Sequence, residues 1–197
     1  MQSYNLIDQP WITCLMKDGS VREVGIHECL ARAPDIAEIT DPSPLIVVSL
    51  HRLLLAILHR NFGPENHATW GELWEKGHWD TRVVDAYLEE WRDRFDLLHP
   101  DRPFYQVPAT EVEDRKLVPV SALSHYHLSD KTSWFNHQPG DGVCPHTLAT
   151  AARLLIMRQA YSFCGWELGK LSDKVTPLLG RTALMMSGST LAETLLL

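Results

Sequence analysis

The chain reads SPLIVVSLHRLLLAILHRNFG from Ser43 to Gly63, and this stretch decides the fold. Between Leu45 and Asn61 the apolar residues recur at the spacing of a helix and form one broad face. That face consists of Leu50, Leu53, Leu54, Ile57 and Leu58. Ser43 is suited to the N-cap with Pro44 at the first helical position, and Phe62-Gly63-Pro64 ends the pattern. The sequence therefore predicts a central core helix.

Two histidines lie within this predicted helix, His51 and His59, on roughly the same side. A metal site needs more ligands than two, and no others are evident nearby, so we interpret both as structural histidines. Ser49, His51 and Arg52 interrupt the apolar run from Pro44 to Leu58, which argues against a membrane span.

The segments before this helix favour a small sheet. Short runs rich in β-forming residues occupy Tyr4 to Asp8 and Trp11 to Leu15. Asp18-Gly19 is typical of a hairpin turn leading into Val21 to Val24. A short helix is expected from about His27 to Ala31.

Further helices are expected after Gly63, at Thr69 to Lys76, Thr81 to Leu98 and His146 to Cys164. Asp80 is suited to cap the second of them. Its expected buried stripe is Val83, Val84, Tyr87, Trp91, Phe95 and Leu98, and its solvated face is Asp85, Glu89, Glu90 and Asp93. The expected inward residues of the third are Leu148, Ala151, Ala152, Leu155, Ile156 and Ala160.

The remaining segments are shorter. Arg102 to Pro108 is predicted to be extended, Thr182 to Met186 to be a buried strand, and Leu191 to Leu197 to begin a helix. Because the chain stops on exposed leucines, we expect Leu191, Leu195, Leu196 and Leu197 to lack their natural cover. We therefore expect residues 1–197 to be a fragment of a longer chain.

The order of these elements predicts the fold class. An early hairpin, several long helices and a late strand do not alternate as βαβ units. The prediction is α+β, a mostly helical mixed domain with a small amino-terminal β-sheet.

Composition indicates an ordinary globular protein. The 197 residues are 45% hydrophobic and 22% charged, which suffices for a sizeable core. A net charge of −7 argues against a protein that coats nucleic acid with a basic surface, although it allows local contacts with nucleic acid. The seven tryptophans are typical of a protein that forms interfaces with partners. Met1 to Tyr4 shows no secretory signal, and the scattered Cys14, Cys29, Cys144 and Cys164 are interpreted as reduced thiols of a cytoplasmic chain.

The most informative loop runs from Lys131 to Gly142 and reads KTSWFNHQPGDG. Pro139-Gly140 marks a turn, and the side chains before it can stack or form hydrogen bonds, but none is a strong nucleophile. This composition favours contact with bases or with a partner surface over catalysis. The alternative is a surface loop whose aromatic side chains lie in the core.

Two enzyme classes were weighed against a binding role. A metal enzyme would draw on His125, His127, His137, Cys144 and His146, because His-x-His and Cys-x-His spacings suit metal ligands. A thiol enzyme would use Cys144 beside His146, but no basic cluster lies there to lower the thiol pKa. A scaffold subunit that never touches nucleic acid is a further alternative. The sequence favours no enzyme, no cofactor and no resident metal.

Three landmarks resemble one family in order and spacing. They are Asn5-Leu6-Ile7-Asp8 with Trp11-Ile12, then Arg102-Pro103-Phe104-Tyr105-Gln106, then Phe135-Asn136-His137-Gln138-Pro139-Gly140. This pattern is similar to the amino-terminal portion of the large subunit (CasA) of the type I-E CRISPR surveillance complex, Cascade. The resemblance implies that residues 1–197 are a single but incomplete amino-terminal domain of a longer subunit.

The resemblance implies a non-catalytic role in antiviral defence. Such a subunit binds the guide RNA and other Cascade subunits, takes part in PAM recognition on double-stranded target DNA, and recruits a helicase-nuclease. It implies a first contact loop consisting of Lys131, Phe135, Asn136, His137, Gln138, Pro139 and Gly140. A second loop, at Gly165, Trp166, Gly169 and Lys170, would approach the minor groove, because glycine lets backbone come close to base edges.

Overall fold

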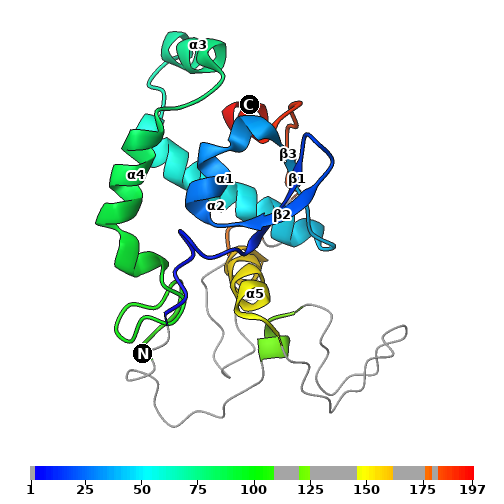
Figure 1. Ribbon diagram of the computed structural model, residues 1–197, viewed down its shortest axis with the longest axis vertical. Helices are drawn as coiled ribbons and strands as arrows, with labels where there is room; N and C mark the ends of the chain where they lie inside the picture. The colour runs from blue at the N-terminus through cyan, green and yellow to red at the C-terminus, as the bar shows by residue number, and fades with distance from the viewer. Residues whose placement is uncertain (1–2, 109–119, 125–145, 162–175, 179–181) are drawn as a thin grey trace.

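The computed structural model describes residues 3–108, 120–124, 146–161, 176–178 and 182–197. Its helices are α1 (Ile26–Ala31), α2 (Pro44–Phe62), α3 (His67–Lys76), α4 (Thr81–Glu90), α5 (Leu148–Tyr161) and α6 (Leu191–Leu196). Its strands are β1 (Ile12–Met16), β2 (Val21–Val24) and β3 (Ile36–Ile39), and its short 3-10 helices are η1 (Ala33–Asp35), η2 (Arg92–Phe95) and η4 (Val120–Leu123). The predicted α+β class is confirmed (Figure 1).

The small sheet has the order β2-β1-β3, and both pairings are antiparallel. The predicted hairpin is confirmed, with Gly19 in the left-handed region at φ 82° and the Asp18 carboxylate accepting the Ser20 N–H at 2.8 Å. Sequence reasoning did not find β3, which pairs with the other edge of β1. Asn5 forms only an isolated antiparallel bridge, to Asp96, and no regular strand.

Helix α2 is the central core helix that the sequence predicts. All five residues of the expected face are buried, and the helix contacts α4, α5 and α6. Ser43 occupies the N-cap position, but its hydroxyl lies 4.0 Å from the Met157 sulfur and makes no capping bond. By length and composition α2 is the one described helix that could cross a membrane, yet its buried side chains pack against this chain's own core as those of a core helix do.

The region after α2 differs from the prediction in one respect. Helix α3 forms as expected, whereas the helix predicted over 81–98 ends at Glu90 and is followed by η2. The reason is a backbone pairing: Leu6 N–H donates to the Phe95 carbonyl at 2.9 Å and Leu97 N–H to the Tyr4 carbonyl at 3.0 Å. This pairing needs extended backbone, which a helix cannot supply.

The buried stripe of this region changes accordingly. Within the predicted set, Val84 and Phe95 are buried and Tyr87 is half-buried, whereas Val83, Trp91 and Leu98 are exposed. Leu88 is buried instead, four residues after Val84 on the same face of α4. Asp80 caps α4 as predicted, because its carboxylate accepts the Arg82 N–H at 3.0 Å.

Helices α5 and α6 complete the core. In α5 the predicted Ala152, Ile156 and Ala160 are buried, whereas Leu148, Ala151 and Leu155 are half-buried. Helix α6 begins after Thr190, whose hydroxyl accepts the Glu193 N–H at 3.1 Å.

The expected lack of cover at α6 is wrong for two of its leucines. Leu191 and Leu195 are buried against this chain's own core, whereas Leu197 is 52% exposed. The indole N–H of Trp70 on α3 donates to the Leu196 carbonyl at 2.7 Å, so α3 lies next to α6 (Figure 1).

The buried strand predicted at Thr182 to Met186 is also wrong. The segment has no regular structure, and Leu184 is 92% exposed. A short apolar run carries too little periodicity to establish burial, and no described strand pairs with this one.

Candidate nucleic-acid interface

The two loops predicted from the sequence lie outside the described residues. This holds for Lys131, Phe135, Asn136, His137, Gln138, Pro139 and Gly140, and for Gly165, Trp166, Gly169 and Lys170. The structure describes instead the stretch between them, 146–161, which contains the helix α5 (Leu148–Tyr161). At 1.5 Å per residue its 14 residues separate the two points of attachment by about 20 Å.

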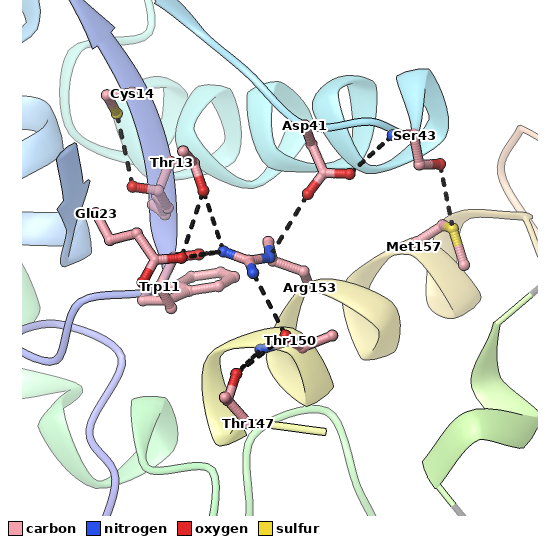
Figure 2. A network of polar contacts seen from close by, with 11 residues as sticks. Trp11, Thr13, Cys14, Glu23, Asp41, Ser43, Thr147, Thr150, Arg153 and Met157 are labelled. Carbon is pink, nitrogen blue, oxygen red and sulfur yellow. Dashed lines mark hydrogen bonds and ion pairs between the residues drawn. The ribbon is translucent and has the colours of Figure 1, made fainter. Parts of the chain in front are cut away.

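The amino-terminal half of α5 is held by Arg153, which lies in the second turn of the helix (Figure 2). One guanidinium nitrogen of Arg153 donates to the Trp11 carbonyl at 2.9 Å, to the Thr13 hydroxyl at 3.1 Å and to the Glu23 carboxylate at 2.7 Å. Its Nε lies 3.5 Å from the Asp41 carboxylate. Residues from β1, β2 and the segment before α2 therefore converge on one side chain of α5.

The low solvent exposure of two of its members strengthens the interactions in this network. The side chains of Arg153 and Asp41 are only 13% and 10% exposed, whereas that of Glu23 is 45% exposed. The Asp41 carboxylate also accepts the Ser43 N–H at 2.8 Å. A cation with several partners in a poorly solvated site fixes the position of its helix more firmly than an exposed ion pair does.

The carboxyl end of α5 is held by different contacts. The Gln159 amide donates to the Tyr105 carbonyl at 3.1 Å, and the Leu178 N–H donates to the Ala160 carbonyl at 3.1 Å. The second of these bonds ties the chain after the predicted second loop back to the end of α5. Ala160 and Leu178 are therefore close together.

Two of the three family landmarks meet around Asp96. Asn5 forms a backbone bridge with Asp96, and Phe104 N–H donates to the Asp96 carbonyl at 2.9 Å. The Asp96 carboxylate accepts the N–H groups of Tyr4 at 3.1 Å and Leu98 at 2.9 Å and the Ser3 hydroxyl. Burial raises the pKa of Asp96, but these hydrogen bonds outweigh it and hold the pKa below its ordinary value.

The second landmark is a turn, so the extended segment predicted at Arg102 to Pro108 is wrong. Tyr105 has φ 52°, and Gln106 N–H donates to the Pro103 carbonyl at 3.1 Å. The ring of Phe104 is buried and stacks on Phe95 with centroids 5.9 Å apart. Burying Phe104 while returning the chain to Leu97 requires the reversal, and Gln106 secures it by donating to the Leu97 carbonyl at 2.9 Å.

The residues of the alternative enzyme sites are mostly outside the described part. This applies to His125, His127, His137 and Cys144, while His146 is described and exposed. No group of three or more potential metal ligands occurs among the described residues. Cys14 and Cys29 are free and buried, and contact with Cys14 together with burial raises the pKa of the Cys29 thiol well above its ordinary value.

The two histidines of α2 differ in environment. His51 is buried, its Nδ1 lies 2.8 Å from the Val47 carbonyl, and burial lowers its pKa. His59 is exposed, so the two do not share one site. The acidic face of α4 is solvated as expected, with Asp85 paired to His27 at 3.0 Å.

Sequence reasoning missed Arg153. Its signal was an arginine within the otherwise uncharged segment from Leu148 to Met157, where a charge is tolerated only if partners meet it. Those partners, Trp11, Thr13, Glu23 and Asp41, are more than 100 residues away, so no local pattern names them.

Comparison with known proteins gives consistent matches. The family described as CRISPR-associated protein Cse1 matches residues 5–197. CasA/Cse1 of Thermus thermophilus is 39% identical over 203 residues, which cover 100% of this chain and 39% of that protein. The crystal structure of Thermobifida fusca Cse1 matches with a TM-score of 0.81 and 30% identity, over 98% of this chain and 38% of the other.

One match belongs to a larger assembly. A chain of a CRISPR RNA-guided surveillance complex has a TM-score of 0.84 and 26% identity, over 100% of this chain and 43% of its own length. Our chain thus spans about two fifths of the relatives it matches. The resemblance found in the sequence landmarks is confirmed, because the family match extends over nearly all residues: the chain belongs to the Cse1 family of CRISPR-associated proteins.

Proposed function

We propose that this chain is the amino-terminal part of a longer, non-catalytic subunit of a CRISPR RNA-guided surveillance complex acting in the cytoplasm. The observation that carries the proposal is the match of the whole chain to a chain of such a complex, with a TM-score of 0.84. Its partners would be the guide RNA, the other subunits, double-stranded target DNA and a helicase-nuclease.

In this proposal α5 presents two contact loops, one at each end. The first, with Phe135 and Gln138, offers an aromatic ring for stacking and an amide for hydrogen bonding. The second, with Gly165 and Gly169, offers backbone that can come close to base edges in the minor groove of the PAM duplex. The Arg153 network supports this role because it fixes the helix to which both loops are joined.

The charge of the chain suits a limited contact. In RNA-guided recognition, base pairing reads the sequence and the protein reads only a short duplex motif. An acidic chain with Lys131 in one loop and Lys170 in the other can contribute a few phosphate contacts without binding DNA indiscriminately.

The experiment uses the full-length subunit in the reconstituted complex. At fixed salt, we would measure the binding of two duplexes, one with the PAM and one with an altered PAM. The measurement compares the unaltered complex with a complex that carries the double substitution Gly165→Val and Gly169→Val. We expect the variant to lose PAM-dependent binding, because two branched side chains keep the backbone from the groove. Gly71→Ala, on the remote helix α3 where a Cβ meets nothing within 4 Å, is the matched control.

Two outcomes contradict the proposal in different ways. If the complex binds target DNA equally well without this subunit, the proposed function is wrong. If the subunit is required for assembly but the loop variants leave DNA binding unchanged, the chain is a scaffold subunit without nucleic-acid contact.

A further inference from the structure

A groove of about 590 Å³ lies between α2, η2, the Tyr105 turn and α5, a volume that suits several residues of a ligand. Its floor is apolar and includes Leu53, Ile57, Phe95 and Phe104, all of them buried. Its rim carries Trp91, Arg94, Arg102, Tyr105 and Val107. We call this feature the Tyr105 groove.

The backbone at Tyr105 is the first sign that the groove has a use. Tyr105 is the one non-glycine residue with positive φ in the described part of the chain. This conformation is energetically unfavourable for any residue that has a β-carbon. Gln159 and Gln106 hold the turn in place through their amides. The turn buries Phe104 but leaves the side chain of Tyr105 itself 53% exposed at the rim of the groove.

The chemistry of the rim is the second sign. Tryptophan, tyrosine and arginine dominate the binding energy of protein interfaces, and the rim presents all three within one hollow. Trp91 is 41% exposed and Val107 is 61% exposed. Sequence periodicity predicted Trp91 to be buried, but α4 ends at Glu90 and the indole is instead exposed beside the apolar floor.

Charge complementarity is the third sign. Within the described residues, neither the Arg94 nor the Arg102 side chain forms an ion pair, whereas their neighbour Arg92 pairs with both Asp8 and Glu89. Both unpaired arginines are exposed. They are therefore available to carboxylates on a ligand that lies along the groove.

We propose that the Tyr105 groove binds an extended segment of another protein chain, one that carries an aliphatic or aromatic residue next to acidic residues. The apolar residue would lie on the floor and the carboxylates would meet Arg94 and Arg102. This inference rests on the proposed function, because the partner is another chain of the same complex. A protein segment fits better than nucleic acid, because the floor is lined by the aliphatic side chains of Leu53 and Ile57 and two arginines offer few contacts to a run of phosphates.

The test is photocrosslinking in the reconstituted complex that contains the full-length subunit. Val107 is replaced by p-benzoylphenylalanine, the complex is irradiated, and the crosslinked peptide is identified by mass spectrometry. We expect a segment of another protein chain with an acidic residue close to the crosslinked position. A second crosslinking site, exposed Ala56 on the groove wall, guards against a local defect at position 107.

Substitutions then test the chemistry of binding. Trp91→Ala and the pair Arg94→Glu with Arg102→Glu should each lower the crosslink yield at least about tenfold, as loss of a central interface residue does. Arg22→Glu, an exposed arginine on β2 away from the groove, should leave the yield unchanged. Melting temperatures of the free variants confirm that each is folded.

Several outcomes overturn the inference. These are a crosslink to nucleic acid, a crosslink to this chain or a second copy of it, a crosslinked segment without acidic residues, and no crosslink from either position in a complex that assembles. Failure of the unaltered subunit to enter any complex contradicts the proposed function itself, so the two failures are distinguishable.

Discussion

Removing the Arg153 guanidinium should destabilise the domain more than any exposed ion pair could. Arg153→Met keeps most of the aliphatic stem and removes every donor. The substitution leaves the Trp11 carbonyl, the Thr13 hydroxyl and two carboxylates without the group that joins them.

The magnitude follows from burial. Glu23, 45% exposed, recovers most of its hydration, so its share of the loss is small. Asp41, 10% exposed, keeps the Ser43 N–H but loses its cation in a poorly solvated site. Losing charged hydrogen bonds of this kind costs about 2–4 kcal/mol of unfolding free energy, less than a fully buried pair would cost. For a chain of this size that corresponds to a fall in melting temperature of about 4–16 °C.

The assay is urea unfolding of the 197-residue chain at neutral pH, with Arg22→Met as the matched control. The control removes an exposed arginine from β2 and should change stability by less than about 0.5 kcal/mol. Arg153→Lys should lose less than Arg153→Met, because it keeps the charge but cannot reach all the partners at once. If Arg153→Met matches the control, the network does not hold α5 and the reasoning is wrong.

Three further substitutions test other parts of the molecule. Phe135→Ala in the reconstituted complex should weaken target-DNA binding about ten- to a hundredfold with an unchanged melting temperature of the free chain; a fall in melting temperature with intact binding would identify a core residue. Gly25→Ala should cost about 1–3 kcal/mol in urea unfolding, because a Cβ there overlaps the Ile7 carbonyl, whereas Gly71→Ala should stabilise by up to about 1 kcal/mol. Asp96→Asn should lower stability at pH 7 and flatten its pH profile: the folded pKa is depressed, so this carboxylate stabilises above its unfolded pKa of about 4 and less as pH falls; an unchanged acid profile would refute this.

Sequence periodicity predicted the elements whose burial follows from their own residues. Helix α2 carries a regular apolar face along its length and needs no distant partner to be recognised. The β1–β2 hairpin is specified by Asp18-Gly19, because few other dipeptides accept that turn. In both cases the local preference and the tertiary environment agree.

Prediction failed where distant contacts override local pattern. The helix predicted over 81–98 ends early because Phe95 and Leu97 pair with the amino-terminal segment about 90 residues away. The turn at Tyr105 is held in part by Gln159, which is 54 residues away and so lies outside any local window of sequence. The candidate interface is a prediction from motif order and its residues lie outside the described part of the chain, whereas the Arg153 network that positions α5 is visible only in three dimensions.

The position of α5 reconciles an acidic chain with a proposed role at nucleic acid. The carboxylates of α4 face solvent and repel phosphates, so DNA contact would be confined to the loops joined to α5. Few phosphates would then be neutralised by this subunit, and its contribution to the salt dependence of binding would be small. Such a subunit would distinguish target DNA from other DNA by the positions of its few contacts. The rigidity of α5 would therefore matter more than the total charge of the chain.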